Sequence, residues 1–212
     1  MAETEIIMGN VMDYLEWRGD LTFDQSPFND VDNVILSQLA YVNFRDVIPS
    51  VQMNKGITLK AAAQLFFDLH TEEELMQDKS FIKDAPKLLK KAAQTNRFRD
   101  VILSDYVDMV DETLEKQFGA FHIKLSPQCT YVAFRGTDDT LVGWKEDFNM
   151  SFISPVPSQE DAVKYLDDTC SYIRGKLYVG GHSKGGNLAI YSAIHCSKRV
   201  RKKIQCVYNN DG

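Results

Sequence analysis

Residues 178–186 read Tyr178-Val179-Gly180-Gly181-His182-Ser183-Lys184-Gly185-Gly186 and contain the pattern G-x-S-x-G. The residues before the pattern are apolar, as in a buried strand, and those after it recur at helical spacing. A serine held at a tight strand-to-helix turn needs small residues two positions before and after it, because these positions approach neighbouring backbone. Gly181 and Gly185 meet this need. The placement indicates a nucleophile elbow, with Ser183 as the candidate nucleophile.

Other interpretations of this glycine-rich segment are weaker. The phosphate-binding pattern G-x-x-x-x-G-K-[ST] fails because Gly186, not lysine, follows Gly185. The dinucleotide pattern G-x-G-x-x-G fails because His182 stands where the second glycine is required. A glycine-rich strand-to-helix turn that only packs well remains an alternative to the elbow.

A second turn with chemical interest follows the apolar run 130–134. Hydrolases with a nucleophile elbow need two backbone N–H donors for the tetrahedral oxyanion, one of them from the residue after the nucleophile, here Lys184. The other comes from the loop after an adjacent strand, where Thr137 lies. The Thr137 hydroxyl is a candidate third donor. In the alternative interpretation, Arg135-Gly136 is an ordinary turn and Arg135 pairs with an acidic neighbour.

The chain of 212 residues suits a single domain, 1–212, with a helical N-terminal part (1–100) and a sheet-containing part with the elbow (101–212). Strands that alternate with helices predict an α/β protein with a mostly parallel sheet and helices on both faces. The first two strands, joined by a short connection, are expected to form an antiparallel edge hairpin. Strands are expected at 101–110, 117–125, 130–134, 177–179 and 204–208, and helices at 34–42, 59–69, from Asp84 onward, 158–174 and 184–195.

The chain resembles the class 3 (fungal-type) lipases, and within them an uncharacterised bacterial branch. The resemblance rests on Phe134-Arg135-Gly136-Thr137, Trp144, Asp147 and the Gly-His-Ser-x-Gly elbow. It implies an α/β-hydrolase fold, Ser183 as nucleophile, Thr137 as oxyanion donor, and a lid at about 138–157. Lys184 departs from the family, in which leucine usually follows the serine. Whether Trp144, Phe148, Met150 and Phe152 belong to a lid or to the core stays open.

A serine hydrolase also needs a histidine base and an acid that orients it, in the chain order Ser, Asp or Glu, His. Asp211 is a candidate acid, although a turn residue is the alternative. His195 lies twelve residues along the expected elbow helix, about 18 Å from Ser183, and is too far to act as the base. His182, in the elbow itself, is expected to be structural, and His70 and His122 are expected to be partly buried or surface histidines. The C-terminal part with the catalytic histidine is therefore expected to be missing; a catalytically inactive binding or scaffold protein is the alternative.

Composition narrows the class of protein further. The net charge of −6 argues against nucleic acid as a partner. Met1–Glu5 lacks the basic start of a signal peptide, and no apolar run is long enough to span a membrane, so a cytoplasmic protein with four free cysteines is expected. The expected substrate is a small-molecule or lipid acyl compound, with no cofactor or metal; oligomeric state stays open. The basic cluster 198–203 is expected to complement a helix C-terminus, with nucleic acid or membrane binding as the alternative.

Overall fold

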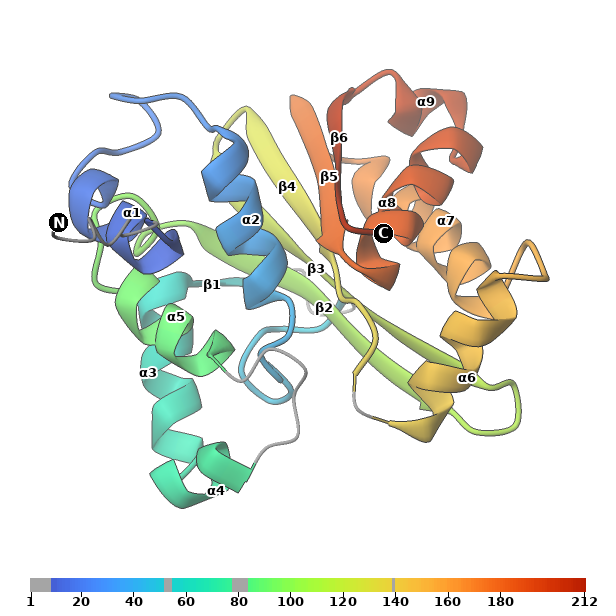
Figure 1. Cartoon of the computed structure of the whole chain (residues 1–212). Coiled ribbons are helices and arrows are strands. Elements are labelled where there is room, and N and C mark those ends of the chain that lie inside the picture. Colours follow the sequence, from blue (N-terminus) through green and yellow to red (C-terminus); the bar gives the residue numbers. More distant parts are fainter. Residues whose placement is uncertain (1–8, 52–54, 78–83, 139) are drawn as a thin grey trace, which may run out of the picture.

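The computed structural model describes residues 9–51, 55–77, 84–138 and 140–212. Within them, six strands form one sheet in the order β1-β2-β3-β4-β5-β6 (Figure 1). The strands are β1 (Gly56–Thr58), β2 (Ile102–Asp111), β3 (Lys116–Ser126), β4 (Cys129–Phe134), β5 (Lys176–His182) and β6 (Ile204–Asn210). The five strands expected from the sequence are thus confirmed, and β1, three residues long, is an addition. Met1–Glu5 and residue 139 of the expected lid lie outside the described residues.

The sheet is mixed, so the expected α/β-hydrolase fold with a mostly parallel sheet is wrong. The pairs β1–β2, β2–β3 and β3–β4 are antiparallel, and the pairs β4–β5 and β5–β6 are parallel. The physical reason lies in the connections. Glu112–Glu115 joins β2 to β3 and Pro127-Gln128 joins β3 to β4, whereas a parallel pair needs a crossover of a dozen or more residues. The hairpin of β2 and β3 is confirmed, but β1, not the hairpin, forms the edge.

The helices begin where the sequence supplies caps. The Asn29 side chain accepts hydrogen bonds from the N–H groups of Val31 and Asp32, and the Asp32 carboxylate accepts the Asn29 N–H in return, which completes a capping box. Thr58 caps the next long helix through the N–H of Ala61. The helices are α1 (Val11–Arg18), α2 (Asp30–Leu39), α3 (Leu59–Leu69), α4 (Glu72–Gln77), α5 (Ala85–Ala92), α6 (Leu141–Met150), α7 (Pro157–Cys170), α8 (Lys184–His195) and α9 (Lys198–Arg201).

Two hydrophobic cores lie on the two faces of the sheet. Side chains alternate along β4, so that Tyr131 and Ala133 join the core beneath α1, α2, α3 and α5, while Val132 and Phe134 join the core beneath α7 and α8. Figure 1 shows these two sets of helices on opposite sides of the sheet. Burial of a side chain as large as Val132 or Phe134 contributes about 1.5–3 kcal/mol. The packing holds β4 and β5 rigidly, and the candidate site lies at their carboxyl ends.

A buried ion pair joins α2 to the turn region after α5. Arg97 and Asp32 are both fully buried, and the guanidinium binds the carboxylate through Nε and Nη2. The same guanidinium donates to the carbonyl oxygens of Leu21, Ser26 and Pro27. One side chain therefore fixes α2 and the irregular segment before it.

The basic cluster supports the helix-end interpretation. Arg201 donates to the carbonyl of Ile194 in the last turn of α8, and Lys203 donates to the carbonyls of Cys170, Ser171 and Ile173 at the end of α7. These contacts satisfy carbonyl groups that a helix end leaves without partners. In the part of the chain that is described, no helix combines the length and apolar character needed to cross a membrane.

Candidate active site

Ser183 occupies the turn between β5 and α8 in a strained backbone conformation. Its φ of 55° and ψ of −132° lie in a region that residues other than glycine rarely adopt. The Ser183 N–H donates to the carbonyl of Asn210 at 2.8 Å, which fixes the turn against β6. The residue is half-buried at the N-terminus of α8. The serine is therefore held at a sharp bend at the carboxyl end of β5.

The glycines on either side are required by close packing. A Cβ on Gly181 would lie 2.4 Å from the carbonyl carbon of Gly185, and one on Gly185 would lie 2.3 Å from the carbonyl oxygen of Phe134. Both distances are shorter than any side chain tolerates. Packing explains the glycines, but a turn that only packs well does not require strain at the serine between them. The strained serine therefore favours a nucleophile elbow.

The loop after β4 runs beside this elbow. Phe134 pairs with Gly181 across the parallel strands, and a Cβ on Gly136 would lie 2.5 Å from the His182 carbonyl oxygen. Thr137, the next residue, is buried, as is Lys184. Within the described part of the chain, neither the Thr137 N–H nor the Lys184 N–H donates a hydrogen bond to a protein acceptor. Both expected oxyanion donors thus flank the elbow with unused N–H groups.

The Thr137 hydroxyl has another partner. Its Oγ1 donates to the Asp147 carboxylate at 2.6 Å, a contact that joins the loop after β4 to α6. The hydroxyl is therefore not placed as a third oxyanion donor in this structure. It positions the loop, and the backbone N–H remains the donor of interest.

Arg135 has the structural role that the alternative interpretation assigned to it. Its guanidinium is buried and forms ion pairs with Asp108 on β2 and, at 3.9 Å, with Asp138. Its backbone N–H donates to the carbonyl of Gly119 on β3. Arg135 therefore anchors the loop that presents Thr137, so the ordinary-turn and oxyanion-loop interpretations are compatible.

The Lys184 side chain forms a buried network that sequence reasoning missed. Its Nζ donates to the carbonyl and the side-chain oxygen of Gln117 on β3, and contacts Glu146 on α6 at 3.0 Å. Burial lowers the pKa of Lys184, and Glu146 opposes that shift. Glu146 also accepts the N–H groups of Gln117 and Ser158. The residue after the candidate nucleophile is thereby tied to the expected lid.

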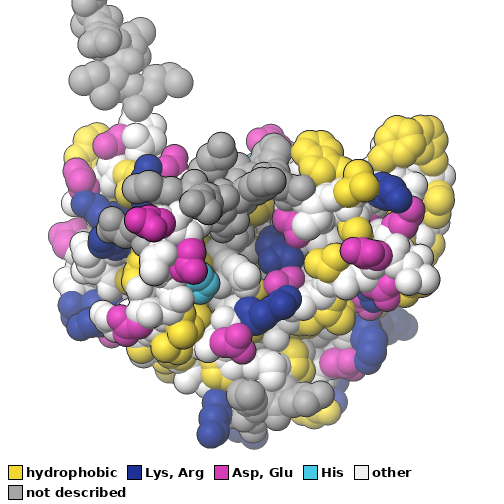
Figure 2. Space-filling model, turned by 90° about the horizontal axis from the view of Figure 1, so that it is seen from below, with side chains coloured by type: hydrophobic (Ala, Val, Ile, Leu, Met, Phe, Trp, Pro, Cys, Tyr) yellow, Lys and Arg dark blue, Asp and Glu magenta, His cyan; other side chains and the backbone are white. Residues whose placement is uncertain are grey.

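The expected lid segment contains α6, whose outer face is apolar and exposed. Trp144, Phe148 and Phe152 are 52%, 67% and 74% exposed, and Met150 is half-buried. Hydrophobic side chains gather over this part of the molecule on the right of Figure 2. The core interpretation is therefore wrong for the three aromatic residues. Whether the segment moves as a lid stays a prediction.

Asp211 follows β6 directly and lies, like Ser183, at the carboxyl ends of the parallel strands. His182 pairs with Asn210, so the segments that follow β5 and β6 leave the sheet side by side. Asp211 is exposed and has a φ of 59°, and the Asn209 side chain bonds both the N–H and the carbonyl of Gly212 around it. These contacts describe a compact turn. They place Asp211 near the elbow without assigning it a catalytic partner.

All four histidines lie among the described residues, and none of their rings hydrogen-bonds Ser183. The His182 Nδ1 lies 2.9 Å from the Tyr41 hydroxyl, a contact that the sequence does not signal. His122 is buried beside Asp105 and Cys170, and His70 contacts the carbonyl of Phe66. His195 lies at the far end of α8 and packs on Tyr191. The expectation that His182 is structural agrees with its contact to Tyr41.

The mixed sheet and the strained serine define an α/β protein with a strand–serine–helix elbow. The chain belongs to the Mbeg1-like family, whose model matches residues 92–212, more than half of its length. Membership of this family is compatible with a lipase-like hydrolase. The matched region includes the elbow, the Thr137 loop and α6. Comparison with curated proteins and with solved structures gives no match.

Proposed function

We propose that the protein is a serine hydrolase that acts on a carboxylic ester or a related acyl compound through an acyl-enzyme at Ser183. One observation carries the proposal: Ser183 adopts a strained backbone conformation at the turn between β5 and α8, between two glycines that leave no space for a Cβ. The resemblance to class 3 lipases supports the same assignment.

The proposed reaction is acyl transfer in two steps. The Ser183 Oγ attacks the substrate carbonyl carbon while its proton passes to a base, and the carbonyl π electrons move onto oxygen. The N–H groups of Thr137 and Lys184, neither of which has a protein acceptor in the described part of the chain, bind this oxyanion. Collapse expels the alcohol, which takes a proton, and water then hydrolyses the acyl-enzyme. Asp211 is the candidate acid of the triad. None of the four histidine rings hydrogen-bonds a described atom of Ser183, so the proposal leaves the base unassigned.

A second candidate function follows from those histidines. Since no imidazole hydrogen-bonds Ser183 among the described residues, the structure also agrees with a catalytically silent member of the family that serves as a binding or scaffold module. Such a protein keeps the elbow for its packing alone. The two candidates differ in the reactivity of Ser183, which can be measured directly.

The test is labelling of the full-length protein with a fluorophosphonate probe, which reacts with activated serines. We expect labelling that is lost in Ser183→Ala and retained in Ser171→Ala, a matched control at a half-buried serine at the C-terminal end of α7. Mass spectrometry of the labelled peptide should locate the adduct on Ser183. A folded wild-type protein that remains unlabelled would exclude the hydrolase and support the silent scaffold.

A further inference from the structure

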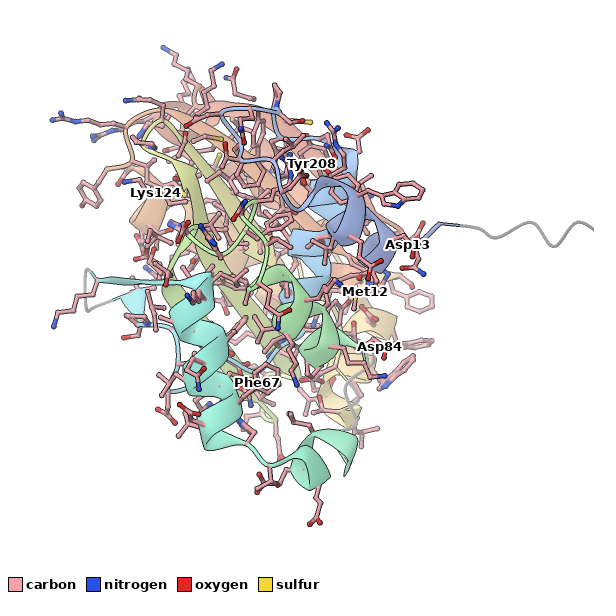
Figure 3. All side chains as sticks on the ribbon, turned by 90° about the vertical axis from the view of Figure 1, so that its left-hand side faces the viewer. Met12, Asp13, Phe67, Asp84, Lys124 and Tyr208 are labelled. Carbon is pink, nitrogen blue, oxygen red and sulfur yellow. The ribbon has the colours of Figure 1, made fainter. Side chains whose placement is uncertain are left out.

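A cavity of about 900 Å³ lies among α3, α4 and α5, in the helical part of the chain. None of its lining residues belongs to the elbow, the Thr137 loop or α6. Figure 3 shows this side of the molecule, with Phe67 on α3 and Asp84 at the start of α5. The volume is within the range of about 300–1,000 Å³ that is typical of sites for small organic ligands. The cavity is therefore large enough for a ligand of its own.

The sequence of the two long helices creates the cavity. The α3 residues Lys60, Ala63, Gln64 and Phe67 line it at spacings of three and four, so they form one stripe along the helix. Across the cavity, α5 and the turn after it supply a second stripe at the same spacing. The members of that stripe are Pro86, Lys87, Lys90, Ala93 and Gln94. The alanines of the two stripes are buried, whereas Lys60, Lys87 and Lys90 are exposed.

Charge distinguishes the rim of the cavity from the rest of the molecule. Lys60, Lys87, Lys90 and Arg99 line it, and among the described lining residues Asp84 is the single carboxylate, in a chain whose net charge is −6. Lys87 already pairs with Asp84 at 2.9 Å. Among the described residues, Lys60 and Lys90 form no ion pair with an acidic side chain. In the described part of the rim, two cations thus lie above buried alanines without an acidic side chain paired to them.

We propose that this cavity binds the anion of a long-chain fatty acid, with the carboxylate at Lys60 and Lys90 and the acyl chain on Ala63, Phe67 and Ala93. Buried alanines provide an aliphatic floor, which suits a flexible chain. The Lys90 ammonium lies 5.8 Å from the centroid of the Phe67 ring, so that face of the ring is covered and not available to stack a planar base. The cation above this ring is instead placed to meet a carboxylate.

The test is titration of the full protein with oleate, below its micellar concentration, by isothermal calorimetry and by amide NMR. We expect one site, with shifts concentrated on α3 and α5. The double variant Lys60→Glu, Lys90→Glu should weaken binding by about tenfold or more, because two favourable contacts become repulsive. Both positions are exposed, so the fold should be retained. The matched control is Lys198→Glu, Lys202→Glu, which makes the same charge change in the exposed basic cluster and should leave the affinity unchanged.

Three results would overturn the proposal. The first is absence of oleate binding. The second is an equal loss of oleate affinity in both double variants, because the loss would then not depend on Lys60 and Lys90. The third is equal affinity for oleyl alcohol, which has the chain without the charge. The inference is independent of the proposed hydrolase, because Ser183→Ala should bind oleate as the wild type does; loss of binding in that variant would place the ligand at the elbow instead.

Discussion

Two ion pairs in this molecule are equally buried but join different structures. Arg97 and Asp32 join α2 to the segment before it, far along the sequence from the elbow, and the guanidinium also satisfies three carbonyl oxygens there. Lys184 and Glu146 join the residue after Ser183 to α6. Removing charges from water is costly, and only complete hydrogen bonding offsets that cost. The comparison teaches that one pair serves stability alone, whereas the other couples stability to the candidate active site.

The largest expected effect is that of Arg97→Met. The substitution leaves Asp32 buried without its cation and three carbonyls without their donor, and should lower the free energy of unfolding by about 5 kcal/mol. Urea denaturation measures this loss. Arg97→Lys, which keeps the charge but not the planar fork, should lose less. Fluorophosphonate labelling of Ser183 in folded Arg97→Lys should match the wild type. Destabilisation no greater than that caused by Arg199→Met, at an exposed arginine, would show that the Arg97–Asp32 pair does not stabilise the fold.

Lys184→Met should lower the free energy of unfolding by about 4 kcal/mol, because Glu146 keeps two N–H donors but loses its cation. Adding Glu146→Gln should recover part of that loss, since no buried charge then remains. Unlike the arginine variants, Lys184→Met should also slow labelling of Ser183 by about tenfold or more, because a small displacement of an oxyanion donor is costly. This last expectation rests on the proposed function. An unchanged labelling rate in the folded variant would show that the pair is structural only.

The elbow could be predicted from the sequence because its cause is local. Gly181 and Gly185 are separated from Ser183 by one residue each, and the steric need for small residues acts over that same distance. The strand positions were readable for the same reason, since alternation and apolar runs are local signals. The antiparallel β2–β3 hairpin could also be predicted, from its short connection. The antiparallel direction of β3–β4 was not predicted, although the two-residue turn Pro127-Gln128 excludes a parallel pair there.

The networks around the elbow could not be predicted in this way. Glu146 is thirty-eight residues from Lys184, and Tyr41 is 141 residues from His182, so only the folded chain shows these partners. The sequence shows that the lysine after the serine departs from the class 3 lipases, but no local signal predicts that its side chain is buried. The sequence similarly indicated an aromatic segment at α6 without deciding that Trp144 and Phe148 face outward.

A third buried ionisable group, His122, is expected to make the stability of the fold depend on pH. His122 lies against Asp105 at 3.3 Å and Cys170 at 3.6 Å on the face of the sheet covered by α7. Burial lowers the pKa of His122, but Cys170 and Asp105 raise it more, to about 9. The folded state thus holds a proton that the unfolded chain releases near pH 6.5. The resulting stability is fully present below about pH 6.5 and is lost as pH rises through about 9, by about 3 kcal/mol in all.

The measurement is the free energy of unfolding of wild type and His122→Gln in urea between pH 6 and pH 10. Glutamine is neutral at every pH, so the variant should lose the decline between about pH 6.5 and 9 that the wild type shows. His195→Gln, at the exposed end of α8, is the control and should keep the decline. Asp32 raises the pKa of Arg97 against the effect of burial, so Arg97 stays charged in this range, and the lowered pKa of Lys184 makes stability rise, not fall, with pH. A decline that persists in His122→Gln would therefore assign it to another group. Of the three buried sites, the one centred on the imidazole is the one whose stabilising contribution is expected to decline between about pH 6.5 and 9.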